Sequence, residues 1–288
     1  MKHVILTSLL LLASLLGSCT ANNTADTGTD TTAPDAAQTT AEQTTDTEAA
    51  PPAAVLLFED NFDGTELDST KFMRCPEWKR QGELCIWDED MSYLDGEGHL
   101  VLRADWDEKK GRVRSGGVRS DGIFTAGYAY YEASIAFPVA YGIWGAFWMM
   151  CGDVYSEDGS AADGVEIDII ESIHNQRGVC NSAMHWDGYG DAHKTLNTGD
   201  MTDYDIYDGN FHTFGLERLE TGYVFYIDGK ETWRVGADEC EPCPEQGYLK
   251  LTVEAADWSG AGTEDAIAAL PAEMYVDYVR VYSEKPAE

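Results

Sequence analysis

Three carboxylates, Glu166, Asp168 and Glu171, lie close together in the stretch "DGVEIDIIESIHN", among Val and Ile residues. β-Branched residues favour extended structure, so we expect a β-strand here. Three like charges on one strand repel one another, and a raised pKa of at least one carboxyl is the expected relief. A retaining glycosidase needs one ionised carboxylate and one protonated carboxyl about 5 to 5.5 Å apart, which neighbours on one strand face can supply.

Strand geometry decides whether the three acids meet. Side chains alternate between the two faces of a strand, so Glu166 and Asp168 share a face while Glu171 would point to the other one. One β-bulge near Ile169 and Ile170 would bring Glu171 back beside Asp168, because the extra residue shifts the alternation. With this bulge all three acids would line one groove. An acidic edge strand and a calcium site are the alternatives.

Aromatic residues flank the acids on both sides. They lie in "YGIWGAFWMM", with Trp144 and Trp148, and in "AMHWDGYG", with His185, Trp186 and Tyr189. Sugar rings bind through their C–H faces on aromatic rings, so this composition suits a saccharide cleft. Core packing is the alternative for each ring. We expect core packing for Phe147 and Trp186, and a place in the groove for Trp144.

Strand-like segments separated by turns make up the rest of the folded part. Short runs rich in Val, Ile, Tyr, Phe and Trp recur between Gly, Asp and Asn: "HLVLRADW", "YAYYEASIAF", "VEIDIIESI", "YVFYID", "LKLTVEAA" and "MYVDYVRVY". These segments have no sustained 3.6-residue periodicity, which favours a β-sandwich or barrel. Asp228-Gly229 predicts a hairpin turn. No internal repeat is evident, so we expect one all-β domain over residues 55–288.

The N-terminal residues predict export. A short basic start precedes the apolar run Val4 to Leu16, which is too short to span a bilayer but suits a secretory signal. Gly17 and Ser18 before Cys19 resemble a bacterial lipoprotein cleavage box. We therefore expect a signal peptide at 1–18 and a lipidated Cys19, giving an exported, membrane-anchored lipoprotein at the cell surface or facing the periplasm. An ordinary signal peptide cleaved nearby is the alternative.

Residues 19–54 have the composition of a tether. From Thr20 to Ala54 the chain has no Lys, Arg, aromatic residue, Leu, Ile or Val, so it lacks the apolar surface needed for folding. Its acidic groups repel one another and favour an extended, disordered segment. Contact with a membrane is therefore expected through the lipid anchor alone.

Charge limits the class of partner. The chain has a formal net charge of −33, and most of it falls on residues 55–288. Such a field repels polyanions, which excludes nucleic acid and disfavours sulfated or uronic polysaccharides unless a local basic patch opposes it. A neutral polysaccharide fits this field better, and we expect a monomer.

Six cysteines follow Cys19, and export would permit disulfides among them. They are Cys75, Cys85, Cys151, Cys180, Cys240 and Cys243, and their pairing cannot be deduced from sequence alone. The "CEPC" motif formed by the last two could be a redox or metal pair. It lies in a Pro-rich loop without a second pair at zinc-finger spacing, which favours a structural or incidental role.

The chain resembles glycoside hydrolase family 16, the laminarinase and lichenase group of endo-β-glucanases. "EIDIIE" looks like the bulged active-site strand of that family, and further segments follow in family order: "GHLVLRA", "YYEASIAFP", "GIWGAFWM", "DGNFHTFGLE" and "YVFYIDG". The resemblance implies an all-β, concanavalin A-like β-jelly-roll sandwich with a concave substrate cleft.

The resemblance also implies roles for individual residues. Glu166 would be the nucleophile, Glu171 the acid/base, and Asp168 the group between them that tunes the pair. The substrate-binding residues would be Trp144, His185 and Trp258, with Arg119 as a further candidate. His185 could instead be a hydrogen-bonded structural histidine. The chemistry would require no cofactor. Relatives carry a structural calcium ion away from the cleft, for which no loop here has a firm signature.

Departures from the family pattern leave the substrate open. They are Gly145 in "WGAFW", Ser92 in "MSYLDGEGHL" and the segment "TVEAADWSG" in place of a Gly-rich one. By the resemblance these positions belong to the glycone side of the cleft. A β-glucan with β-1,3 or mixed β-1,3/1,4 linkages is the first expectation, and an endo-β-galactosidase acting on a neutral galactan or host glycan is the second. A non-catalytic glycan-binding protein would need neither Glu166 nor Glu171.

Overall fold

The computed structural model describes residues 53–80, 84–173 and 179–287. The predicted signal peptide, the lipidated Cys19 and nearly all of the tether lie outside these residues. Helix is scarce in the described part, which holds the 3-10 helix η1 (Glu89–Met91) and the short α-helix α1 (Glu264–Ala268). None of the helices within these ranges is long and apolar enough to cross a membrane.

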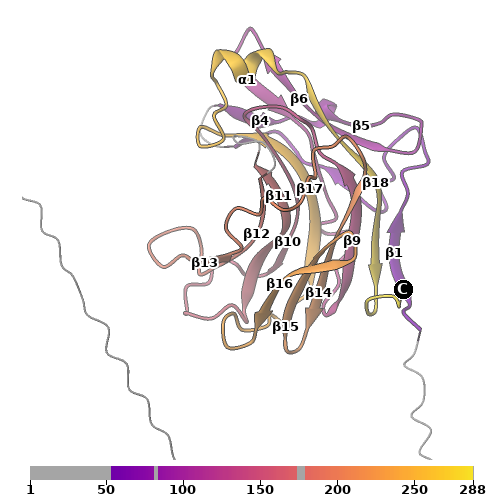
Figure 1. Ribbon diagram of the computed structural model, residues 1–288, viewed down its shortest axis with the longest axis vertical. Coiled ribbons are helices and arrows are strands. Elements are labelled where there is room, and N and C mark those ends of the chain that lie inside the picture. The colour runs from indigo at the N-terminus through magenta and orange to yellow at the C-terminus, as the bar shows by residue number, and fades with distance from the viewer. Residues whose placement is uncertain (1–52, 81–83, 174–178, 288) are drawn as a thin grey trace, which may run out of the picture. The chain divides into compact units, whose positions relative to one another are not determined.

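Strands dominate the described residues and form two sheets (Figure 1). The large sheet has eleven strands in the order β16-β15-β14-β9-β18-β6-β7-β4-β3, with β1 also paired to β18 and β5 to β6. Its members are β1 (Leu56–Asp60), β3 (Trp78–Arg80), β4 (Cys85–Trp87), β5 (Ser92–Leu94), β6 (Leu100–Asp107), β7 (Arg112–Ser115), β9 (Ala129–Ala136), β14 (His212–Leu219), β15 (Gly222–Ile227), β16 (Lys230–Gly236) and β18 (Ala272–Tyr282).

The small sheet has seven strands in the order β13-β12-β11-β10-β17-β8-β2. Its members are β2 (Met73–Arg74), β8 (Gly117–Arg119), β10 (Ile143–Gly152), β11 (Gly164–Ile173), β12 (Cys180–Trp186), β13 (Lys194–Asn197) and β17 (Gly247–Ala255). Pairing is antiparallel in both sheets except between β4 and β7, which run parallel.

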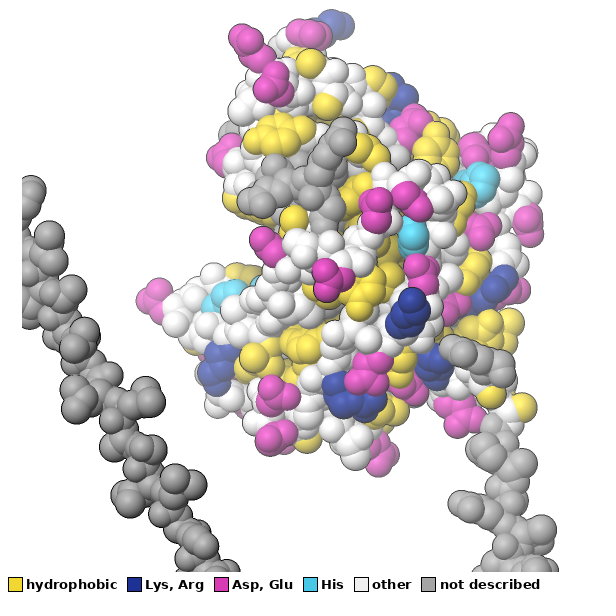
Figure 2. Space-filling model, viewed as in Figure 1, with side chains coloured by type: hydrophobic (Ala, Val, Ile, Leu, Met, Phe, Trp, Pro, Cys, Tyr) yellow, Lys and Arg dark blue, Asp and Glu magenta, His cyan; other side chains and the backbone are white. Residues whose placement is uncertain are grey.

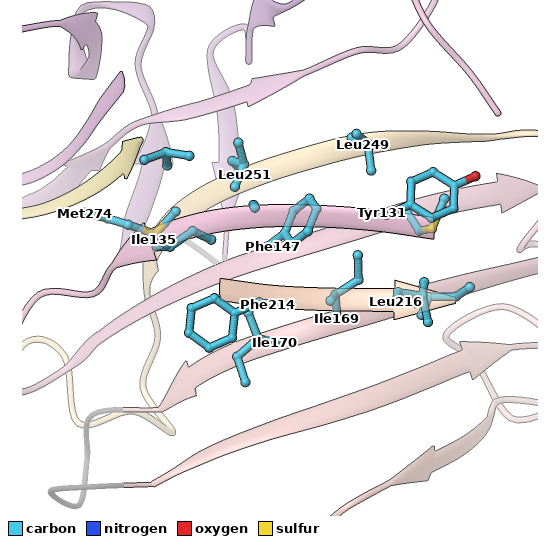
Figure 3. Close-up of a cluster of buried hydrophobic side chains, with 14 of the residues drawn as sticks. Tyr131, Ile135, Phe147, Ile169, Ile170, Phe214, Leu216, Leu249, Leu251 and Met274 are labelled. Carbon is cyan, nitrogen blue, oxygen red and sulfur yellow. The ribbon is translucent and has the colours of Figure 1, made fainter. Parts of the chain in front are cut away.

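The hydrophobic core lies between the two sheets (Figure 3). Each sheet buries alternate side chains against the other, as the period of two along a strand requires. The small sheet contributes Phe147, Ile169, Ile170, Leu249 and Leu251, and the large sheet contributes Tyr131, Ile135, Phe214, Leu216 and Met274. Only one face of the small sheet is used in this way, so its other face is free to form a site.

The strand predictions and the all-β sandwich are confirmed. The six predicted segments correspond to β6, β9, β11, β15, β17 and β18. The predicted hairpin joins β15 to β16, and both turn residues have positive φ, 49° at Asp228 and 73° at Gly229. Such values suit the primed turns that match the right-handed twist of paired strands.

The predicted β-bulge is present in β11. Asp168 pairs with Ala183 of β12 and Glu171 pairs with Asn181, so three steps along β11 match two along its partner. Ile169 and Ile170 are both buried in the core as a result. The extra residue returns Glu171 to the face that carries Asp168, as the alternation argument requires.

The cysteines carry no disulfide in the described structure. Cys75, Cys85, Cys151, Cys180, Cys240 and Cys243 are all buried with free thiols. Cys240 and Cys243 lie in the core, where Arg218 donates a hydrogen bond of 2.9 Å to the carbonyl of Cys243. The structure therefore agrees with the structural interpretation of the "CEPC" motif.

Acidic side chains are spread over the face of the molecule seen in Figure 2, with fewer Lys and Arg among them.

Candidate active site

A cavity of about 760 Å³ lies on the face of the small sheet that points away from the core. All seven residues predicted for the site line this cleft: Glu166, Asp168, Glu171, Trp144, His185, Trp258 and Arg119. They come from β8, β10, β11, β12 and the segment after β17. Sheet pairing thus collects residues that are spread over more than a hundred positions of the sequence.

The three acids have different surroundings on their common strand face. Asp168 is 5% exposed, whereas Glu166 and Glu171 are partly exposed. Tyr189 donates a hydrogen bond of 2.5 Å to Oε2 of Glu166. Nε2 of His185 lies 3.4 Å from Oδ2 of Asp168, so His185 contacts the acid cluster in addition to filling the cleft wall.

The electrostatics of the cleft favour a proton on the acid cluster. Burial raises the pKa of Asp168 well above its ordinary value, and the charge of Glu166 raises it further. Burial also raises the pKa of Glu171 well above its ordinary value, and the charge of Asp168 is the next cause. A carboxyl that stays protonated into the neutral range is what a general acid needs.

Aromatic rings form the walls and floor of the cleft. Trp144 and Trp258 meet edge to face, with ring centroids 4.9 Å apart and planes at 63°. Trp148 forms part of the floor, and its indole Nε1 donates a hydrogen bond of 3.0 Å to Oγ1 of Thr252. Phe147 and Trp186 lie in the core as predicted, and Trp144 lines the cleft as predicted.

Several residues that line the cleft were not among the predicted site residues. Lys250, Thr252 and Glu254 alternate along β17 with buried Leu251 and Val253, and they line the cleft. This alternation is readable in "LKLTVEAA" and could have placed them on one face. The cleft residues Arg80 and Trp87 had no comparable signal, because strand pairing brings them there, whereas Tyr189 belongs to the aromatic residues that the sequence placed near the acids.

Gly145 and Ser92, two of the departures from the family pattern, lie outside the cleft. The expectation that they belong to the glycone side of the cleft was therefore wrong. Gly145 faces the core, where a Cβ would approach a ring carbon of Phe137 to 2.9 Å and the sulfur of Met274 to 3.0 Å. Ser92 is buried and exchanges hydrogen bonds with the backbone of Gly117. Neither side chain can contact a sugar, so the departures that bear on specificity are those of β17.

The metal-binding alternative has one candidate cluster among the described residues. One ligand atom from each of Glu166, Asp168 and His185 lies within 4.8 Å of the other two. Calcium prefers six to eight oxygen ligands. Two carboxylates and an imidazole fit that preference poorly, so this geometry favours acid–base chemistry over a calcium site.

The Arg80–Glu254 pair supports the cleft floor, and its loss should destabilise the fold. Arg80 Nε donates a hydrogen bond of 2.9 Å to Oε2 of Glu254, which is 1% exposed. Arg80→Met would leave a buried carboxylate without its partner, so we expect a loss of about 2 kcal/mol in the free energy of unfolding by urea denaturation. Arg103→Met removes ion pairs to partly exposed Asp105 and Glu273 and should cost less than about 1 kcal/mol. Equal losses in the two variants would contradict this account.

The Tyr189–Glu166 hydrogen bond should matter for the rate. A bond between a hydroxyl and an ionised carboxylate is charge-assisted, so Tyr189→Phe is expected to lower kcat about tenfold. Tyr226→Phe is a matched control, because Tyr226 donates a bond of the same 2.5 Å length to Glu217 on the large sheet. Initial rates on one polysaccharide compare the two variants. If Tyr226→Phe lost as much activity, the loss in Tyr189→Phe would come from a general disturbance of the fold and not from the bond to Glu166.

Sequence comparison finds relatives along most of the folded part. Residues 80–280 match the model of the family described as Glycosyl hydrolases family 16. The chain is 24% identical to glucan endo-1,3-beta-glucosidase A1 of Niallia circulans, over 84% of this chain and 39% of the relative. It is 30% identical to keratan-sulfate endo-1,4-beta-galactosidase of Sphingobacterium multivorum, over 79% of this chain and 54% of the relative. The chain thus spans only 39% to 54% of the length of these two curated relatives.

Structure comparison finds the same fold in solved enzymes. A Bacteroides ovatus mixed-linkage glucan protein, solved in complex with a G4G4G3G product, matches with a TM-score of 0.66 and 24% identity over 78% of this chain and 99% of that chain. The catalytic domain of a Thermotoga petrophila endo-1,3-beta-glucanase matches with a TM-score of 0.65 and 24% identity, covering 82% and 99%. These likenesses confirm the jelly-roll sandwich.

Proposed function

Because the chain belongs to glycosyl hydrolase family 16, we propose that it is a retaining, endo-acting glycoside hydrolase of β-linked polysaccharides. The observation that carries this proposal is the bulged strand β11, which holds Glu166, Asp168 and Glu171 on one face of an aromatic cleft. Among the three, Asp168 and Glu171 have raised pKa values because of burial and neighbouring charge. A binding module would need no such arrangement of acids.

The proposed reaction has two displacements. Glu166 attacks the anomeric carbon and forms a glycosyl ester, while the bond to the leaving oxygen breaks and that oxygen takes the proton of Glu171. Glu171 then removes a proton from water, which attacks the anomeric carbon and releases Glu166. The two inversions give net retention. Asp168 tunes the pair through its charge, and the scheme uses no cofactor.

A β-glucan with β-1,3 or mixed β-1,3/1,4 linkages is the proposed substrate. The glucanases among the relatives support this, since their names specify these linkages. An endo-β-galactosidase activity is the second candidate. It is favoured by the relative of 30% identity, a keratan-sulfate endo-1,4-beta-galactosidase.

Hydrolysis assays test the proposal directly. The purified protein would be incubated with laminarin, barley β-glucan, lichenan and a neutral galactan, and reducing ends and oligosaccharide products would be followed together. Short oligosaccharides from a glucan are expected, and their structures identify the cleaved bond. Cleavage of the galactan alone would select the second candidate, and binding without cleavage of any polymer would leave a glycan-binding role.

We further propose that the protein acts as a monomer, exported and anchored through lipid on Cys19. The basis is the sequence "LLGSC" and the tether composition that follows it. Metabolic labelling with a fatty acid should mark the wild-type protein and leave Cys19→Ser unlabelled. Labelling that persists in the variant would contradict the anchor.

A further inference from the structure

An ammonium group without a direct ion pair lies in the cleft lining. Lys250 of β17 is only 7% exposed, and its Nζ lies 3.6 Å from the ring centroid of Trp148 and 4.8 Å from that of Trp87. Aromatic faces attract a cation but supply no neutralising charge. Among the described residues, no direct ion pair or hydrogen bond of this ammonium is found, and the carboxylates of Glu254 and Glu166 act on it at longer range. Lys250 is therefore a buried cation without a direct ion pair, and of the two carboxylates that act on it, Glu254 is already paired with Arg80.

A second cation lies beside the first on the neighbouring strand. Arg119 of β8 is directly opposite Lys250 in the antiparallel pairing of β8 and β17. Like charges placed opposite each other destabilise a sheet. Nη1 of Arg119 lies 3.5 Å from Asp121, but its buried Nε has no hydrogen-bond partner among the described residues. The two strands thus bring two incompletely satisfied cationic groups into one part of the cleft lining.

The position of this pair relative to the acids is fixed by sheet register. Trp148 of β10 pairs with Lys250 on one side and with Asp168 on the other. Arg119, Lys250, Trp148 and Asp168 therefore form one row across the small sheet. With strands about 4.8 Å apart, Lys250 lies two strands, roughly 10 Å, from the acid strand. This span suits a sugar ring and its substituent.

The remaining cation of this region is already neutralised. Arg80 donates to Glu254 at 2.9 Å, so it has a carboxylate of its own. A neutral hydroxyl bound at Lys250 would leave this buried ammonium without a direct ionic partner, whereas an anion would supply one.

We propose that Lys250 and Arg119 form a subsite for an anionic substituent, a sulfate ester or a carboxylate, on a sugar next to the scissile bond. The inference rests on the proposed function, because the acids of β11 locate the scissile bond. It narrows the substrate to a β-linked glycan with sparse anionic groups, since the net charge of −33 repels a dense polyanion.

The test compares neutral and anionic forms of the same polymers. A β-glucan and a β-galactan are each prepared neutral, sparsely sulfated, and sparsely oxidised at C6 to carboxylates. Binding is measured by calorimetry with the full chain carrying Glu166→Gln, and hydrolysis with the wild-type chain. At least one anionic form should bind about tenfold more tightly than its neutral parent. The sulfated and oxidised arms identify which anion is taken.

Substitutions test whether Lys250 and Arg119 cause the tighter binding of anionic polymers. Lys250→Met, added to Glu166→Gln, should remove the tenfold preference, and Lys250→Arg should retain most of it. Lys285→Met is the matched control, because Lys285 also lies over an aromatic ring, 5.2 Å from Tyr226, outside the cleft lining. Thermal melts confirm folding, and Arg119→Met replaces Lys250→Met if the latter does not fold.

Three outcomes would overturn the subsite: equal binding of neutral and anionic forms, a preference that survives both Lys250→Met and Arg119→Met, or no binding of any form. Failure of the proposed function has a different signature. It would be the absence of hydrolysis in every arm, while the binding data still decide the subsite.

Discussion

Glu166→Gln and Glu171→Gln are each expected to reduce kcat on a polysaccharide by about 10⁴-fold or more, with the fold intact. Gln has nearly the shape of Glu but can neither form the glycosyl ester at position 166 nor donate a proton from position 171. Initial rates of reducing-end formation measure the loss. Glu132→Gln is a matched control on β9 of the large sheet, where Glu132 accepts bonds from Tyr130 and Tyr278. It should retain near wild-type activity.

Addition of azide distinguishes the nucleophile Glu166 from the acid/base Glu171. With an aryl glycoside, whose leaving group needs no protonation, Glu171→Ala should still form the ester on Glu166. Azide then takes the place of water, forms the new C–N bond and releases Glu166, so the product is the β-glycosyl azide. Glu166→Ala should not give this β-product, because it cannot form the ester. A β-azide from Glu166→Ala, or full activity in either Gln variant, would refute the assignment.

Asp168→Asn is expected to lower kcat/KM at neutral pH by about 10²- to 10³-fold and to change its pH dependence. Glu171 must be protonated to act as the acid, so activity falls as pH rises through its pKa. Burial raises this pKa and the charge of Asp168 raises it further. Removing that charge lowers the pKa of Glu171, and the alkaline limb of the profile should move to lower pH.

A pH profile of kcat/KM for the wild type and Asp168→Asn measures this shift. Asp60→Asn is the control, since Asp60 is also buried with a raised pKa but lies on β1 of the large sheet. Its profile should keep the wild-type alkaline limb. An alkaline limb that stays in place in Asp168→Asn, or moves to higher pH, would show that Asp168 does not tune Glu171.

The acid strand could be predicted because the local sequence contains its own constraints. Ile167 must face the core and Asp168 must not, and the spacing of Glu171 then requires an extra residue. The bulge follows from this alternation without knowledge of the partner strands. The same alternation places Gly145 on the core face between Trp144 and Ala146, so its assignment to the cleft was avoidable.

The charged floor of the cleft depends on contacts between distant parts of the chain. Arg80 and Glu254 are separated by 174 residues. The pairing of β3 with β4 and the contact between β4 and β17 bring them together. Arg119 meets Lys250 through the register of β8 and β17. A sequence shows which face each residue occupies, but it does not specify these registers. Lys250 could therefore be placed on a face, and its lack of a direct ion pair could not be foreseen.

Trapping of the covalent intermediate tests the central claim most directly. The wild-type protein would be incubated with a 2-deoxy-2-fluoro β-oligoglucoside bearing a dinitrophenyl leaving group, with a galactoside analogue in parallel, and digested for peptide mass spectrometry. Our account predicts one glycosyl ester, on Glu166. An ester on another carboxyl group would contradict it, as would an unlabelled protein that cleaves polysaccharide with inversion at the anomeric carbon.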